Sequence, residues 1–95
     1  MTTGNGHVQL RFLFEAPSLR QAGDLAAALR TRGRNKVQVR HATPRHWTVI
    51  ATTPPTLAGY PSLKLVEREM EDLAQRHPGC RIVGWTRLPP ADAPA

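Results

Sequence analysis

The sequence predicts an α+β domain in which two helices cover one face of a four-stranded antiparallel sheet. Two observations predict this class. In four segments apolar residues alternate with polar ones, which is typical of half-buried strands, and in two longer segments they recur every three or four positions, which is typical of amphipathic helices. The chain has 95 residues, a usual size for one domain, and its single cysteine excludes a disulfide framework.

The first half of the chain predicts a strand, a helix and a second strand. Residues 7–14, HVQLRFLF, alternate without a break and form the first strand. Ser18 and Gln21 have the spacing of a capping box, so that a helix begins here, and Gly33 is its natural end. The apolar stripe of this helix consists of Leu19, Ala22, Leu25, Ala26 and Leu29. The second strand is expected at residues 36–42, whose core face carries Val37, Val39 and His41.

The second half predicts a strand, a helix and a last strand. The third strand is expected at residues 45–52, with Trp47, Val49 and Ala51 toward the core. A loop rich in proline and glycine leads to the second helix at residues 61–76. The segment HPG ends that helix, because the residue before a proline resists helical geometry. The last strand is expected at residues 80–87, CRIVGWTR.

The order βαββαβ is that of a ferredoxin-like domain. Because βαβ crossovers are right-handed, both helices lie on one side of the sheet and leave its other side uncovered. We therefore expect a single ferredoxin-like domain over residues 1–87, followed by a disordered Pro/Ala tail at residues 88–95.

Charge is distributed unevenly along the chain, whose net charge is +6. No acidic residue stands between Asp24 and Glu67, and the basic residues in this gap are Arg30, Arg32, Arg34, Lys36, Arg40, Arg45 and Lys64. Four acidic residues then stand close together, namely Glu67, Glu69, Glu71 and Asp72. One side of the molecule is therefore expected to attract polyanions or acidic proteins.

The sequence predicts no membrane segment and no export signal. No apolar run approaches the roughly 18–20 residues of a membrane span, and MTTGNGH at residues 1–7 lacks the basic region of a signal peptide. A single cysteine fits a reducing compartment. We expect a cytoplasmic protein without a membrane partner.

Two histidines flank the turn in VQVRHATPRHWTVI, residues 37–50, and raise the question of a metal site. Strand parity directs His41 toward the core and His46 to the opposite face, so that they do not converge on one ion. His77 and Cys80 have H-x-x-C spacing but lack a second pair of ligands. No nucleophile–base pair stands out. We expect a protein that is not an enzyme and has no metal or cofactor.

The candidate binding surface is the uncovered face of the sheet. Strand parity gives it Gln9, Arg11, Leu13, Lys36, Gln38, Arg40, His46, Thr48 and Ile50. If Ile82 faces the core, the same parity adds Arg81, Val83, Trp85 and Arg87. This face would be basic and half apolar, with one exposed tryptophan. The residues expected to bind a partner are Arg11, Lys36, Arg40, His46, Arg81, Trp85 and Arg87.

Two kinds of partner suit such a face. An acidic protein is our first expectation, because Trp and Arg are common anchors of protein interfaces. Single-stranded nucleic acid is the alternative, because bases stack on aromatic rings while arginines hold phosphates. RNA-recognition sheets of this topology carry two or three exposed aromatic residues in an RNP1-type motif, and this chain lacks that motif.

Several short motifs occur in the order known from one protein family. They are FLF at 12–14, ALRTRG at 28–33, VQV at 37–39, WTV at 47–49, LAQRHPG at 73–79 and the closing Gly84-Trp85. Over residues 8–86 the chain resembles the regulator of ribonuclease activity B family. The resemblance implies a ferredoxin-like fold and a protein-level inhibitor of ribonuclease E, active in RNA metabolism.

The chain also departs from this family. Members tend to be acidic and to carry an acidic Tyr-Asp before the Gly-Trp, whereas here Ile82-Val83 stands there and the chain is basic. A second resemblance, to small-molecule-binding ACT domains, rests on a strand, EAPSL at 15–19 and a helix. It leaves a ligand-sensing or dimerisation module as a third reading, and both a monomer and a homodimer remain open.

Overall fold

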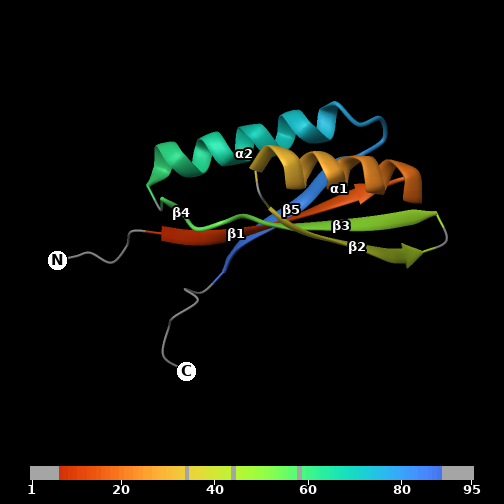
Figure 1. Ribbon diagram of the computed structural model, residues 1–95, viewed down its shortest axis with the longest axis horizontal. Helices are drawn as coiled ribbons and strands as arrows, with labels where there is room; N and C mark the ends of the chain where they lie inside the picture. Colours follow the sequence, from red (N-terminus) through yellow and green to blue (C-terminus); the bar gives the residue numbers. More distant parts are fainter. Residues whose placement is uncertain (1–6, 34, 44, 58, 89–95) are drawn as a thin grey trace, which may run out of the picture.

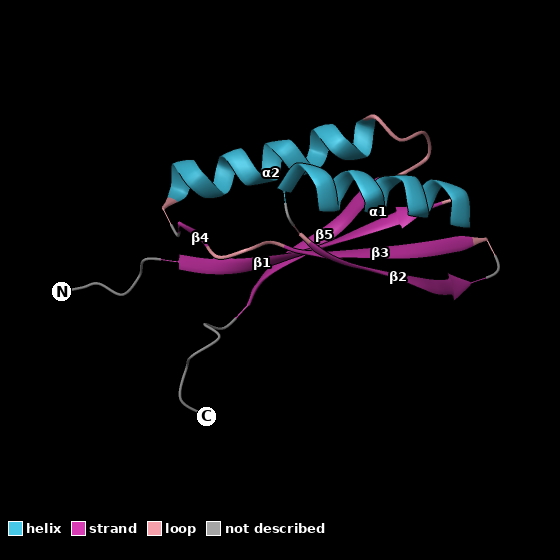
Figure 2. Ribbon diagram, in the orientation of Figure 1, coloured by secondary structure: helices cyan, strands magenta, loops and turns pink. Residues whose placement is uncertain are grey.

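Two helices lie against one face of a sheet, and no described helix or strand covers the other face (Figure 1). The computed structural model describes residues 7–33, 35–43, 45–57 and 59–88. Its strands are β1 (His7–Ala16), β2 (Lys36–Thr43), β3 (His46–Thr52), β4 (Thr56–Leu57) and β5 (Arg81–Leu88). Its helices, drawn in cyan in Figure 2, are α1 (Leu19–Gly33) and α2 (Tyr60–Gln75).

β1 is the central strand of the sheet. β3 pairs with it on one side and β5 on the other, β2 extends the sheet beyond β3, and every pairing is antiparallel. The two-residue β4, which the sequence did not predict, pairs with the first residues of β1. The main elements follow the order βαββαβ, so the predicted ferredoxin-like α+β fold is confirmed.

The hydrophobic core lies between the sheet and the helices. Alternation along β1 buries Leu10, Phe12, Phe14 and Ala16 completely or nearly so. The other core residues are Ala22, Leu25, Ala26, Leu29, Val49, Ala51, Met70, Leu73 and Ala74. Leu19, expected in the apolar stripe of α1, is 56% exposed, because it is the first residue of the helix and lies beyond the core.

Local hydrogen bonds and one turn set the ends of the helices. The backbone N–H of Gln21 donates to Ser18 Oγ at 3.2 Å, as the capping-box spacing predicted. Past the end of α1, Asn35 Nδ2 donates to the carbonyl oxygen of Leu29 at 2.8 Å. Gly79, in the HPG turn, has a φ of 79°, and a Cβ there would lie 2.8 Å from Pro17 Cγ, so that only glycine fits this position.

Two strands are longer than predicted, because β1 continues to Ala16 instead of ending at Phe14 and β2 continues to Thr43. β5 has the predicted length but lies one residue later, so that it includes Leu88 of the expected tail. The rest of the expected tail, residues 89–95, lies outside the described residues. Within the described residues, neither helix is long and apolar enough to cross a membrane.

The pairing of β1 with β5 contains a β-bulge. Leu13 lies opposite Gly84 and Phe14 lies opposite Ile82, so that Val83 is an extra residue without a partner on β1. Beyond the bulge the faces of β5 are therefore shifted by one residue. Trp85 lies opposite the buried Phe12, on the helix side of the sheet.

Candidate binding face

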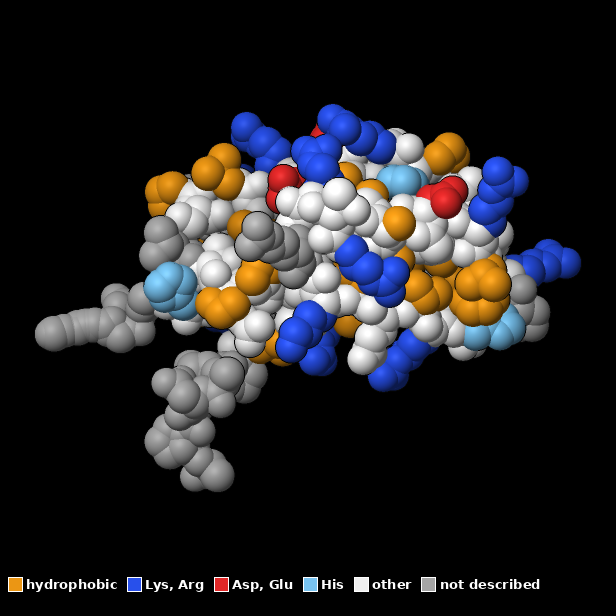
Figure 3. Space-filling model, in the orientation of Figure 1, with side chains coloured by type: hydrophobic (Ala, Val, Ile, Leu, Met, Phe, Trp, Pro, Cys, Tyr) orange, Lys and Arg blue, Asp and Glu red, His pale blue; other side chains and the backbone are white. Residues whose placement is uncertain are grey.

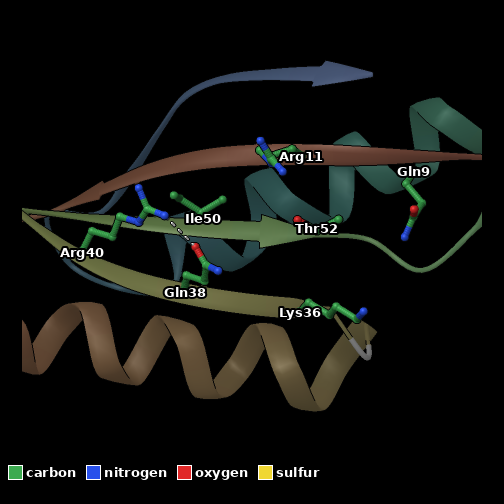
Figure 4. A pocket seen from close by; sticks show the side chains of 7 residues that line it. All are labelled: Gln9, Arg11, Lys36, Gln38, Arg40, Ile50 and Thr52. Carbon is green, nitrogen blue, oxygen red and sulfur yellow. Dashed lines mark hydrogen bonds between the residues drawn. The ribbon is translucent and has the colours of Figure 1, made fainter. Parts of the chain in front are cut away.

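The open face of the sheet, the side turned away from the helices, contains a hollow of about 440 Å³. We call it the basic hollow; its lining residues are Gln9, Arg11, Lys36, Gln38, Arg40, Ile50 and Thr52 (Figure 4). Strand pairing brings them together, because Thr52 lies opposite both Arg11 of β1 and Lys36 of β2. The middle strand β3 contributes the shorter side chains, Ile50 and Thr52, and its neighbours contribute longer ones, which form the walls.

The basic hollow is positively charged. Arg11, Lys36 and Arg40 line it, and none of its described lining residues is a carboxylate. Arg40 Nη2 donates to Gln38 Oε1 at 3.3 Å, and among the described residues none of the three cations forms a salt bridge. In Figure 3, Lys and Arg side chains project below the sheet, whereas the acidic side chains visible in that view lie on the helix side. The hollow is therefore suited to an anionic group.

Arg81 lies on the open face, as predicted, but its charge is neutralised. Its Nε and Nη2 atoms donate to Glu15 Oε1 at 3.1 and 2.9 Å, and the two residues face each other across β1 and β5. Glu15 lies outside the first strand expected at residues 7–14 and so was not among the residues predicted on this face. The signal was available, since Ala16 continues the alternation up to Pro17.

His46 lies at the end of the β2–β3 hairpin and outside the basic hollow. Its Nδ1 and Thr43 Oγ1 are hydrogen-bonded at 3.1 Å, and its ring is exposed. His41 lies opposite Trp47, and their rings stack at 4.3 Å between centroids. The two histidines thus lie on different faces, as strand parity predicted. Within the described part of the chain, no group of three or more His, Cys, Asp or Glu residues is arranged to hold a metal ion.

The prediction that Trp85 and Arg87 lie on the open face is wrong, and the bulge at Val83 is the reason. Trp85 stacks on Phe12 with 5.9 Å between ring centroids, and its Nε1 donates to Glu67 Oε2 of α2 at 3.3 Å. The indole is still 43% exposed. Arg87 lies opposite the buried Leu10 and is exposed beside the helix layer. Single-stranded bases therefore have no tryptophan to stack on at this face.

Cys80 is half-buried in the turn before β5. Burial raises the pKa of its thiol, and the negative charge of Asp24 raises it further, so that the protonated thiol predominates at neutral pH. A thiol in this state is a poor nucleophile, because the thiolate is the reactive form.

The fold and the face together define a ferredoxin-like α+β domain with a basic hollow on the uncovered side of its sheet. No family model matches the chain, and a search of curated proteins gives no match either. The resemblance to the regulator of ribonuclease activity B family thus stays a prediction from the short motifs.

Proposed function

We propose that this protein is a non-catalytic interaction domain whose open sheet face binds an acidic segment of a partner protein. The observation that carries this proposal is the basic hollow, where three cations surround a concave surface and no carboxylate of residues 7–33, 35–43, 45–57 or 59–88 lines it. Opposite charge across an interface speeds association and selects the partner. Because the three cations form no salt bridge among the described residues, a partner carboxylate would not have to displace one.

The composition of the hollow favours a peptide over single-stranded nucleic acid. Single-strand binders combine a basic groove with aromatic rings for the bases, and Trp85 lies on the other side of the sheet. The hollow instead offers side-chain amides from Gln9 and Gln38 and an apolar floor from Ile50. Amides can donate to and accept from a peptide backbone, and Ile50 can contact an apolar side chain next to the acidic ones.

The more specific form of the proposal concerns the partner. The resemblance to the regulator of ribonuclease activity B family implies a ribonuclease, and modulation would follow if the bound domain covered part of its surface. A basic hollow requires an acidic patch on that enzyme. The single cysteine fits a reducing compartment, so the proposed setting is the RNA-decay machinery of the cytoplasm.

The test measures binding of a fluorescein-labelled oligoglutamate peptide by anisotropy, with labelled single-stranded RNA titrated in parallel. The charge-reversal variant is Arg11→Glu combined with Arg40→Glu. Its matched control is Arg20→Glu combined with Arg68→Glu, which changes the net charge equally on exposed helix positions. We expect the first variant to weaken peptide binding about tenfold or more, and the control to weaken it much less.

The salt dependence and the RNA titration decide between the readings. Peptide binding should weaken between ionic strengths of about 0.01 and 0.15 M, because the contacts are charged and exposed. Equal losses in the two variants would show a response to net charge alone and contradict the proposal. Tighter binding of RNA through Arg11 and Arg40 would replace it with the nucleic-acid reading.

The ribonuclease is tested separately. Purified ribonuclease E cleaves a fluorogenic RNA in the presence of increasing amounts of the protein, and the same two double variants are compared. Slower cleavage with the wild type and the helix-side control, but not with the Arg11/Arg40 variant, would support a ribonuclease modulator. Unchanged cleavage at a concentration that saturates peptide binding would remove ribonuclease E as the partner and leave the interaction domain.

A further inference from the structure

The two long edge strands of the sheet are β2 and β5, and the two-residue β4 is a further, short edge. The hydrogen bonds of β1 determine which backbone groups of β2 and β5 point away from the sheet. The N–H of Thr53 donates to the carbonyl oxygen of Leu10, so the backbone groups of Leu10 point toward β3. Backbone direction alternates along an antiparallel strand. The odd-numbered residues of β1 therefore bond to β5, and the β5 residues opposite the even-numbered ones have backbone groups that point away from the sheet.

The β2 edge is partly closed by a side chain. The same alternation directs the backbone groups of Val37 outward, and Arg30 Nη2 of α1 donates to the carbonyl oxygen of Val37 at 3.2 Å. Lys36 and Arg40 add charge to this strand. Charges and side chains that cover backbone groups are how proteins prevent unwanted pairing at a sheet edge.

The β5 edge has no such cover among the described residues. Trp85 and Arg87 lie opposite Phe12 and Leu10, so their N–H and C=O groups point outward. No side chain of the described chain donates to or accepts from them. The apolar side chains next to this edge are also exposed, with Val83 at 55% and Trp85 at 43%.

We propose that two copies of this chain pair through β5, antiparallel, about a two-fold axis at Thr86. Only outward-pointing residues can exchange backbone hydrogen bonds, which restricts the register. Placing Trp85 opposite the partner's Arg87, and Arg87 opposite the partner's Trp85, uses both outward-pointing residues of each copy. Thr86 then lies opposite the partner's Thr86, and the bulge at Val83 stays outside the new ladder. The same surface serves both copies, so the assembly closes as a dimer.

In this register, the side chains that the two copies bring together on the helix side of the sheet are complementary in charge. The partner's Arg87 lies directly across from the exposed indole of Trp85, where a guanidinium gains a cation–π contact. Glu67, which accepts from Trp85 Nε1, places a carboxylate next to the same guanidinium. The two-fold axis repeats the contact, so that two cations each meet a ring and a carboxylate.

The register is also complementary on the open side of the sheet. The partner's Leu88 lies opposite Gly84, where a Cβ would have no neighbouring atom within 4 Å. This empty space lies beside the exposed side chain of Leu13, which lies opposite Gly84 on β1. Leu88 of each copy thus covers apolar surface on the other.

The dimer would have one continuous sheet with both basic hollows on the same side. An acidic partner with two suitable segments would bind both hollows and gain avidity. The pairing itself does not depend on what the hollows bind, and it can be tested without any ligand.

The test uses an engineered thiol at the two-fold axis. In a pair of residues that do not exchange hydrogen bonds, Cα atoms lie about 4.5 Å apart, within the range of a disulfide. The variant Thr86→Cys is made in a Cys80→Ala background and oxidised mildly. Its control is Thr31→Cys in the same background, an exposed residue of α1. We expect the Thr86→Cys chain to become a covalent dimer well before the control, and equal rates would overturn the proposal.

Sedimentation equilibrium of the unmodified chain provides a second measurement. We expect a dimer to form between about 1 µM and 1 mM, with Arg87→Glu weakening it about tenfold or more. Arg20→Glu makes the same change of charge on α1 and should leave the equilibrium unchanged; circular dichroism checks that each variant is folded. A monomer throughout this range, or a dimer that responds equally to both variants, would overturn the β5 pairing.

Discussion

β3 and β5 both pair with β1, and they differ in one respect. The β1–β3 ladder runs without interruption from Arg11 opposite Thr52 to Ala16 opposite Trp47. The β1–β5 ladder is interrupted at Val83, after which its faces are exchanged. Strand parity therefore predicted the faces of β3 correctly and misplaced the second half of β5. Parity is a reliable guide only as long as the register is continuous.

The difference between the two ladders also explains why the basic hollow and Trp85 lie on opposite sides of the sheet. The β1–β3 ladder, and the β2–β3 ladder from Lys36 to His41, are continuous. They place long polar side chains beside short ones and produce the basic hollow. The bulged strand turns Trp85 toward α2, where it contacts Phe12 and Glu67. One extra residue thus moves the only tryptophan of β5 from a possible stacking site to the boundary between the sheet and a helix.

The largest effect is expected at Phe12, which lies opposite both Ala51 of β3 and Trp85 of β5. Phe12→Ala removes a fully buried ring that packs against the rings of Phe14 and Trp85, and it should lower the free energy of unfolding by about 3–5 kcal/mol. Urea denaturation measures the change. Leu13→Ala, one residue further on and 36% exposed, is the control and should lose less than half as much. Equal losses of unfolding free energy in the two variants would contradict the assignment of Phe12 to the buried face of β1 and of Leu13 to its open face.

A smaller effect is expected at Thr53, where β3 ends. Its side chain is buried, and its Oγ1 accepts the backbone N–H of Leu10 at 3.0 Å in place of a ladder bond. Thr53→Val keeps the shape but leaves this buried N–H without an acceptor, which should cost about 1–3 kcal/mol. The same substitution at Thr52, on the open face, should be nearly neutral in thermal or urea unfolding. A neutral Thr53→Val variant would show that Leu10 has another acceptor.

Much of the fold followed from the sequence, because it rests on local and periodic signals. The alternation of β1, the Ser18 cap and the HPG turn are each contained in a few neighbouring residues, and the structure has all three. The basic hollow could also be predicted, since Arg11, Lys36 and Arg40 lie in parts of β1 and β2 where the register with β3 is continuous. The exposed position of Leu19 could not be predicted, because it depends on where the first residue of α1 lies relative to the sheet.

The errors have a common physical origin in pairing between distant segments. The bulge at Val83 depends on how β5 fits against β1, and the sequence Ile82-Val83-Gly84 does not show which residue is the extra one. The neutralisation of Arg81 depends on Glu15, which is 66 positions away in the chain. The bulge leaves no periodic signal. The alternation up to Ala16 does place Glu15 on the open face, but its pairing with Arg81 depends on the register between β1 and β5, which the sequence pattern does not give.

Deletion of Val83 tests the comparison of the two ladders directly. Removing the extra residue makes Ile82 and Gly84 adjacent, opposite Phe14 and Leu13, and leaves every later residue on its present face. We expect the chain to fold with a change of no more than about 1 kcal/mol in the free energy of unfolding. The NOE between the rings of Trp85 and Phe12 should persist.

The matched control inserts one alanine between Gly84 and Trp85. The insertion moves Trp85 to the other parity, so the Trp85–Phe12 NOE should disappear unless a new bulge forms. Loss of this NOE in the deletion variant as well would show that the bulge is needed to hold Trp85 on the helix side. The interpretation of Val83 as an extra residue would then be wrong.

The smallest effect on stability is expected from Glu15→Gln. This variant should change the affinity for an acidic peptide while it leaves the free energy of unfolding nearly unchanged. The salt bridge to Arg81 is exposed, so its loss should cost only about 0.5 kcal/mol. The same substitution releases the charge of Arg81, which lies in the same cross-strand row of the open face as Arg40 of the basic hollow. The affinity for oligoglutamate in the anisotropy assay should therefore rise. Asp24→Asn makes the same change of charge on α1 and is expected to leave that affinity unchanged. Equal gains in both variants would mean that the total charge, rather than the open face, governs binding.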